Sequence, residues 1–200
     1  MDFFDFFQLL ILAVFLLIFI GRTIHLYLIG RNVFVIGHGK SIRTNFMEIL
    51  FSVGLLFWIY LLLINTLHLT PGILPASIFI HQIHKLYIQI PGMIMICLGM
   101  IIFVLGIFSF KKSWRIGIDP QTKDELITSG IFSFTRNPIF IFINIYFIGT
   151  SLIYPTPFFI SFTLITLIGI HHHIKKEEYF LSKHYGKSYS NYLKKVRRYF

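Results

Sequence analysis

The chain has 200 residues, of which 56% are hydrophobic and only 13% are charged, and its formal net charge is +10. A soluble domain would carry roughly a quarter charged residues, so this composition indicates a single integral membrane domain. The apolar composition argues against a nucleic-acid partner and assigns the positive charge to a cytoplasmic membrane face. The single cysteine, Cys97, excludes a disulfide framework within one chain.

Long apolar runs predict an all-α membrane protein with five transmembrane helices, because a spanning helix needs about 20 mostly apolar residues. The predicted spans are residues 3–29, 46–69, 86–110, 139–154 and 158–174. The first run starts with acidic residues and lacks a small-residue cleavage site, so we expect a span there and not a signal peptide. We expect N-terminal spans in residues 1–85 and a catalytic core in residues 86–200 of one domain.

Two prolines separate the fourth predicted span from the fifth. The link is only Pro155-Thr156-Pro157. Proline cannot continue either helix interior, and a link this short forces the two helices to run antiparallel. The end of the fifth span is therefore expected beside the start of the fourth.

Lysine and arginine gather on one side of the predicted bundle. Residues 30–45, 111–137 and the tail from residue 175 are basic, whereas the opposite loop, 70–85, holds only Lys85. The positive-inside rule then predicts an external N-terminus and a cytoplasmic C-terminus.

The tail from residue 175 interleaves aromatic and basic side chains. This pattern predicts one or two interfacial helices, interrupted at Gly186. Beyond Gly186, a membrane anchor without chemistry and a contribution to a site fit the pattern equally.

A polar segment, LITSGIFSFTRNPIF at residues 126–140, lies between the third and fourth spans. Asn137 suits the cap of the fourth helix and Pro138 suits its first turn. A helix N-terminus attracts anions, and Arg136 beside it can bind a carboxylate or phosphate. An interfacial anchor at Arg136, followed by a plain helix start, is the alternative interpretation.

Two adjacent acids, Glu177 and Glu178, follow the fifth span, and the hairpin should bring them close to Arg136. A carboxylate there can hold a ribose diol or an ammonium group, although surface ion pairs fit equally. His173 shares a helix face with Glu177 and is a further candidate. The consecutive histidines 171–173 point about 100° apart, so no metal site is predicted.

Several positions combine into a wider pattern. They are Leu126, Ile127, Thr128, Gly130, Phe132, Arg136, Asn137, Pro138, Phe140, Glu177, Glu178, Tyr185, Gly186, Tyr189 and Tyr192. In this combination the C-terminal part of the chain, roughly 90 residues, resembles the isoprenylcysteine carboxyl methyltransferase family, which includes bacterial phospholipid-methyltransferase-like proteins.

The resemblance implies an integral membrane methyltransferase that uses S-adenosylmethionine at the cytoplasmic face. The acceptor would be a lipophilic or prenylated molecule, such as a prenylcysteine-like carboxylate or a lipid headgroup, that arrives from the membrane lipid. Carried over by position, the residues that would bind the cofactor are Asp124, Leu126, Ile127, Gly130, Phe132, Asn137, Pro138, Phe140, Glu177 and Glu178.

Two residues are candidates for a catalytic role. Arg136 would orient an anionic group of the substrate or of the cofactor, and His173 stands where the prenylcysteine enzymes place an arginine. The chain departs from the family pattern at Asn137, where histidine is frequent, and at Phe132 and Phe140, where tyrosine is usual.

Two other functional classes remain open. A nicotinamide-dependent sterol-type reductase would use basic groups such as Lys111, Lys112 and Arg115 for an extra phosphate. A non-catalytic family member would bind no cofactor. The sequence selects neither the acceptor nor the oligomeric state.

Overall fold

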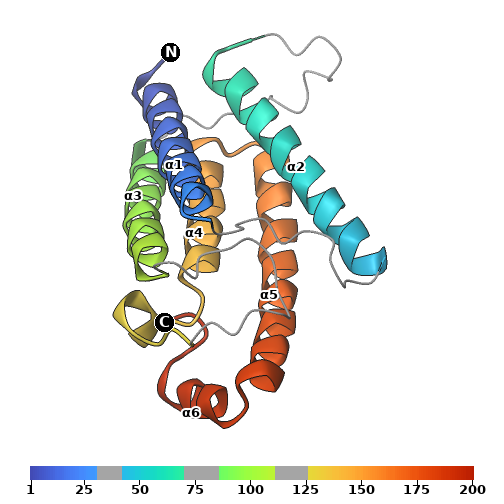
Figure 1. The fold of residues 1–200 in the computed structure, drawn as a ribbon. Helices are drawn as coiled ribbons and strands as arrows, with labels where there is room; N and C mark the ends of the chain where they lie inside the picture. The colour runs from blue at the N-terminus through green and yellow to red at the C-terminus, as the bar shows by residue number, and fades with distance from the viewer. Residues whose placement is uncertain (31–41, 70–85, 111–125) are drawn as a thin grey trace. The chain divides into compact units, whose positions relative to one another are not determined.

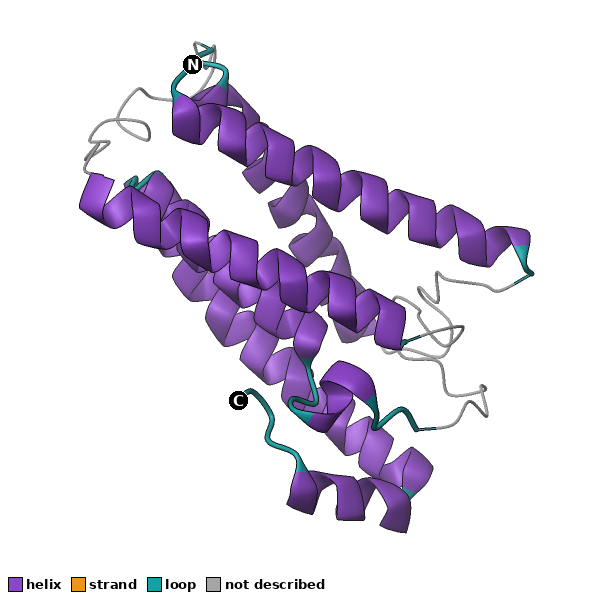
Figure 2. Ribbon diagram, turned by 90° about the vertical axis from the view of Figure 1, so that its left-hand side faces the viewer, coloured by secondary structure: helices purple, strands orange, loops and turns teal. Residues whose placement is uncertain are grey.

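The structure is a computed structural model that describes residues 1–30, 42–69, 86–110 and 126–200. All regular elements in these residues are helices, as the sequence predicted (Figure 2). The helices are α1 (Phe3–Leu28), α2 (Ile42–Thr66), α3 (Leu86–Ser109), the 3-10 helix η3 (Gly130–Ser133), α4 (Pro138–Ile153), α5 (Pro157–Tyr185) and α6 (Lys187–Lys195) (Figure 1).

Three of the described helices, α1, α3 and α5, are long and apolar enough to cross a bilayer. The described apolar part of α2, Ser52–Thr66, is shorter, and so is α4. With 16 residues, α4 is about 24 Å long against a hydrocarbon core of about 30 Å. The structure thus supports a helical membrane protein, and five complete spans remain a prediction.

The fifth predicted span is the apolar part of a longer helix. The predicted span, residues 158–174, lies within α5, which continues without a break to Tyr185. Residues 175–185 contain no glycine or proline and several strong helix formers, so the helix has no reason to stop at the end of its apolar part. The predicted interruption at Gly186 is confirmed, because its φ of +53° suits glycine and separates α5 from α6.

The chain forms two compact units, and the first contains α1 and α2. The side chains of Asp2 and Asp5 form a reciprocal capping box at the start of α1. The Asp5 carboxylate, only 2% exposed, also lies 2.9 Å from Nε2 of His68, just after the end of α2. This contact joins the start of one helix to the end of the other.

The second unit contains α3, η3, α4, most of α5 and α6, and its α3 and α4 pack closely. Three glycines on α3, seven residues apart, face α4: Gly92, Gly99 and Gly106. A Cβ on Gly92 would lie 2.7 Å from the carbonyl oxygen of Gly149, and one on Gly149 would lie 2.5 Å from Cγ1 of Ile96. Small residues let helices approach closely where no hydrophobic effect drives them together.

Hydrogen bonds between α4 and α5 confirm the predicted antiparallel hairpin. The hydroxyls of Ser151 and Thr163 lie 2.6 Å apart, and Thr163 also donates to the carbonyl of Phe147 at 3.1 Å. Near the other end of the pair, the rings of Phe140 and His173 are 5.4 Å apart. The start of α4 therefore lies beside the polar end of α5, where the candidate site residues occur.

Candidate functional site

The polar segment before α4 is held against the end of α3. Gly130 has a φ of +65°, and a Cβ there would lie 2.6 Å from Oγ of Ser109, so both the backbone and the available space require glycine. The buried ring of Phe132 packs edge-on against Phe110 at 4.8 Å. The phenylalanine that replaces the family's usual tyrosine at this position is thus an apolar packing residue.

Helix α6 also contacts this segment. Tyr189, Tyr192 and Val196 form a buried cluster against which Leu126 packs. The Tyr192 hydroxyl donates to the carbonyl of Phe132 at 2.7 Å. Burial raises the pKa of Tyr192 to about 12, although the nearby Arg136 lowers it, so the hydroxyl stays protonated and can donate at neutral pH.

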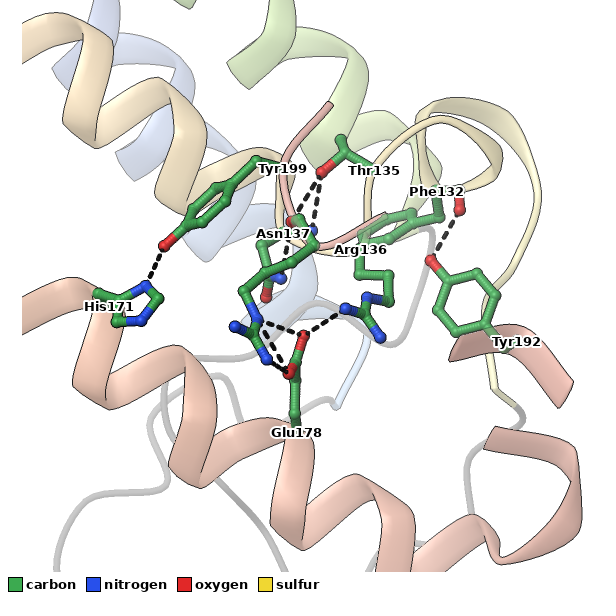
Figure 3. A network of polar contacts seen from close by, with 9 residues as sticks. Phe132, Thr135, Arg136, Asn137, His171, Glu178, Tyr192 and Tyr199 are labelled. Carbon is green, nitrogen blue, oxygen red and sulfur yellow. Dashed lines mark hydrogen bonds and ion pairs between the residues drawn. The ribbon is translucent and has the colours of Figure 1, made fainter. Parts of the chain in front are cut away.

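The centre of the site is an ion cluster around Glu178, which is only 9% exposed (Figure 3). Nη2 of Arg198 donates to this carboxylate at 2.6 Å, and Nε of the same side chain lies 3.1–3.2 Å from both carboxylate oxygens. Nη2 of Arg136 reaches Oε1 at 3.1 Å. The predicted proximity of Arg136 to the acidic pair is confirmed, and the contact is a nearly buried pair and not a surface one.

The cluster carries one excess positive charge, since two guanidinium groups share one carboxylate. Nε of Arg136 is buried and has no hydrogen-bond partner among the described residues. A buried donor without a partner costs free energy unless another group satisfies it. The site therefore favours an additional anionic or acceptor group next to Arg136.

Glu177, in contrast, has no hydrogen bond or ion pair within the described part of the chain, and it is half-buried. It lies beyond the apolar part of α5, after Lys175 and Lys176. Burial and the neighbouring Glu178 raise its pKa to about 7. This carboxylate is available to a ligand, whereas that of Glu178 is occupied.

The pKa of Tyr189 on α6 responds to the charged groups at the end of α5 and before α4. Burial raises the pKa of Tyr189, Glu178 raises it further, Arg136 lowers it and Glu177 raises it. Such effects require proximity. The charges of Glu178, Arg136 and Glu177 thus all act on this one tyrosine of α6.

The start of α4 agrees with prediction in position but not in detail. Asn137 is the cap residue and Pro138 lies in the first turn, as expected. The Asn137 side chain, however, makes no capping bond, and its Nδ2 donates to the carbonyl of Arg198 at 3.0 Å. Oγ1 of Thr135 accepts the N–H of Asn137 at 3.2 Å. The amide turns away because the C-terminal segment presents an acceptor to it.

The remaining predicted residues are more scattered. His173 is exposed, and its ring contacts that of half-buried Phe140. Ile127 is half-buried next to Leu126 in the chain. Asp124 lies outside the described residues, as do the basic residues 111–115 considered for a reductase.

Sequence reasoning did not identify which residues of the C-terminal segment, residues 196–200, contribute to the site. Arg198 binds Glu178, and the hydroxyl of Tyr199 lies 2.7 Å from Nδ1 of His171. The aromatic and basic residues of the tail suit a membrane surface, and the sequence leaves an anchor and a contribution to a site equally open beyond Gly186. A carboxylate that becomes buried needs a cation as its partner. Nothing in the sequence, however, singles out Arg198 among the many basic residues of the tail.

The part of the chain that contains most of the candidate site also matches a known protein family. The model of the phospholipid methyltransferase family matches residues 87–188, just over half of the chain. Two relatives, each called probable protein-S-isoprenylcysteine O-methyltransferase, come from Oryza sativa subsp. indica and subsp. japonica. Each is 27% identical over 113 residues, which are 55% of this chain and 59% of the relative.

The matched part thus spans about three fifths of these relatives' length, 59%. No solved structure matches the chain. The family match extends from α3 to the start of α6 and includes both Arg136 and the acidic pair. The resemblance found in the sequence motifs is confirmed, and the chain belongs to the phospholipid methyltransferase family.

Proposed function

We propose that this protein transfers a methyl group from S-adenosylmethionine to a lipophilic acceptor at the cytoplasmic face of a membrane. One observation carries the proposal beyond family membership. The half-buried Glu177 carboxylate has no partner among the described residues, and Glu177 directly precedes Glu178, the centre of the positively charged Arg136–Glu178–Arg198 cluster, on α5. An unpaired acid and a buried unpaired donor in one region suit a polar ligand that carries both charges.

The polar groups present fit the amino-acid end of this cofactor. That end carries an ammonium and a carboxylate, and the ribose adds two hydroxyls. Glu177 can accept hydrogen bonds from the ammonium or the diol, and the unpartnered Nε of Arg136 can donate to a carboxylate. Glu178 was an equal candidate by sequence, but we assign it a structural role because two arginines already bind it.

The other residues of the proposed site are assigned by position along the same elements. Leu126, Ile127, Gly130 and Phe132 would line the cofactor, with Asp124 preceding them. Asn137, Pro138 and Phe140 would lie beside its methionine end. His173, one turn before Glu177 on α5, would face the acceptor.

Methyl transfer needs little from the protein beyond positioning and the exclusion of water. The bound cofactor would supply an already reactive sulfonium methyl group. Alignment of the acceptor with that methyl group in a water-poor site then supplies most of the acceleration. A carboxylate acceptor requires no catalytic base, whereas an amine acceptor must first lose its proton. Arg136 would hold an anionic group of the cofactor or acceptor in place.

The acceptor class is proposed from the membrane setting and the relatives. The relatives' name points to a prenylcysteine carboxylate, and the family description points to a phospholipid headgroup. Five spans with an external N-terminus and a cytoplasmic C-terminus would put α6 and the cluster on the side where basic residues gather. The family match does not favour the nicotinamide-dependent reductase.

Calorimetric binding of S-adenosylhomocysteine to the detergent-purified full chain tests the proposal. We expect the wild type and Lys176→Gln, an exposed neighbour, to bind, and Glu177→Gln to bind at least about tenfold more weakly, because a charge-assisted hydrogen bond is lost. The single substitution is preferable to a double one, since removal of Glu178 would leave two arginines uncompensated. If the folded wild type binds NADPH and does not bind S-adenosylhomocysteine, the methyltransferase proposal is refuted.

A further inference from the structure

We propose that Arg198 is a positioning residue, which holds the C-terminal segment, residues 196–200, against the start of α4 and so fixes the geometry of the cofactor site. The ligand part of this inference rests on the proposed function, whereas its architectural part rests on contacts alone. Arg198 lies beyond residues 87–188, so the family match assigns it no role.

The C-terminal segment accepts hydrogen bonds from three consecutive residues that lead into α4. The N–H of Arg136 donates to the carbonyl of Arg197 at 3.1 Å. Oγ1 of Thr135 and Nδ2 of Asn137 donate to the carbonyl of Arg198 at 3.2 Å and 3.0 Å. Thr135 and Arg197 also form an isolated parallel bridge. The backbone of residues 135–137 is thus fixed by a segment about sixty residues later in the chain.

Three side chains anchor the segment after α6 ends at Lys195. Val196 packs in the buried tyrosine cluster, and Tyr199 bonds and stacks with His171 on α5, with ring centroids 6.1 Å apart. Between them, the Arg198 guanidinium binds Glu178 on the same helix. Of the three, only Arg198 combines a charge-assisted contact with carbonyl contacts to the loop.

The Arg198 side chain also determines how much of the Arg136 guanidinium is engaged by Glu178. With Arg198 present, Glu178 is bound mainly by its fork, and Arg136 reaches it through Nη2 alone, which leaves Nε of Arg136 unpartnered. Without Arg198, the nearly buried Glu178 carboxylate would have Arg136 as its remaining arginine partner. Burying an unpaired charge costs free energy, so this contact would have to strengthen. Arg136 would then be drawn toward Glu178 and away from a ligand.

The test compares Arg198→Gln and Arg198→Lys with Lys195→Gln, which removes the same charge from an exposed side chain three residues earlier. S-adenosylhomocysteine affinity, unfolding temperature and hydrogen exchange of the Arg136 and Asn137 amides are measured on the full chain in detergent. We expect about tenfold weaker affinity and about tenfold faster exchange for the Gln variant, since it loses charge-assisted bonds. The Lys variant, which keeps the charge but not the fork, should fall between it and the wild type.

A purely structural role would lower the unfolding temperature without weakening S-adenosylhomocysteine binding or selectively accelerating exchange of the Arg136 and Asn137 amides. In turnover assays with S-adenosylmethionine, positioning predicts that the Gln variant raises KM for the cofactor more than it lowers kcat. Affinity and exchange within twofold of wild type in a folded Gln variant would overturn the inference, and so would an equal loss in Lys195→Gln. Should the Gln variant not fold, wild-type values in Arg198→Lys would overturn it instead.

The two proposals fail in different ways. If the wild type does not bind S-adenosylhomocysteine, the proposed function fails, but exchange at the Arg136 amide in the unliganded variants still decides whether Arg198 positions the loop. If the wild type binds and the Arg198 variants bind equally well, only the positioning role fails.

Discussion

At the scale of residues, two adjacent glutamates have opposite environments because a helix turns by about 100° per residue. The Glu178 side chain meets two arginines, whereas Glu177 meets none among the described residues. The paired acid supports the architecture, and the unpaired acid is maintained at a cost in stability. Such a cost is typical of a residue kept for a ligand.

The raised pKa of Glu177 predicts how stability depends on pH. Its folded-state pKa of about 7 lies above its ordinary value of 4.5, so protonation favours the folded state, and this contribution is lost as pH rises from about 5 through 7. Glu177→Gln should therefore raise the unfolding temperature above pH 7, by an amount equivalent to about 1–3 kcal/mol, and change it little near pH 4.5. Thermal unfolding of both proteins in detergent across this range measures the difference.

The matched variant Glu178→Gln should behave in the opposite way. It leaves two arginines around a neutral group and is expected to lower stability by about 2–4 kcal/mol at neutral pH. A Glu177→Gln protein that is less stable than wild type at pH 8 would contradict the assignment of Glu177 as an unpaired acid.

At the scale of elements, the second unit depends on close helix contacts that leave no space for larger side chains. Glycines on α3 and Gly149 on α4 let the two backbones approach, and hydroxyl groups connect α4 to α5. These contacts position the first turn of α4, which directly follows Arg136 and Asn137 of the candidate site. A change in the middle of the helices is thus expected to reach the site through the tilt of α4.

Gly149→Val tests this packing. Its Cβ would lie 2.5 Å from Cγ1 of Ile96 and 2.7 Å from the carbonyl oxygen of Gly92, so the helices must separate. We expect a loss of about 1–3 kcal/mol in stability, together with weaker S-adenosylhomocysteine binding, both measured in detergent. Gly169→Ala on α5 is the control, because nothing lies within 4 Å of its added Cβ. An equal effect of the two substitutions would argue against close packing as the cause.

At the scale of the whole molecule, the charge distribution predicts one basic membrane face. Residues 30–45, 111–137 and the tail carry nearly all lysines and arginines, and the segment 70–85 carries one. With five spans, these three basic segments lie on the same side. The candidate site, which includes the tail, would then open to the cytoplasm.

Single cysteines test this orientation in a Cys97→Ser background. A membrane-impermeant maleimide should label Ser77→Cys on intact cells, and it should label the exposed Ser188→Cys in the tail only after the membrane is permeabilised. The cysteine-free parent should stay unlabelled. Labelling of both variants to the same extent in intact cells would refute the predicted topology.

The sequence by itself determined the helical membrane class, the proline-linked hairpin, the break at Gly186 and the family. Apolar length, proline and glycine act locally, and the family motifs are short, so each can be recognised without knowing what lies nearby. The proximity of Arg136 to the acidic pair also followed, because an antiparallel hairpin allows one arrangement of its ends.

Only the tertiary structure decided which acid is paired, where Asn137 points, and that Arg198 returns to bind Glu178. The tail offers many basic residues of similar chemistry, and the choice among them depends on how α6 folds back, which is a property of long-range packing. The local pattern therefore specified the elements, and contacts between distant segments specified the site.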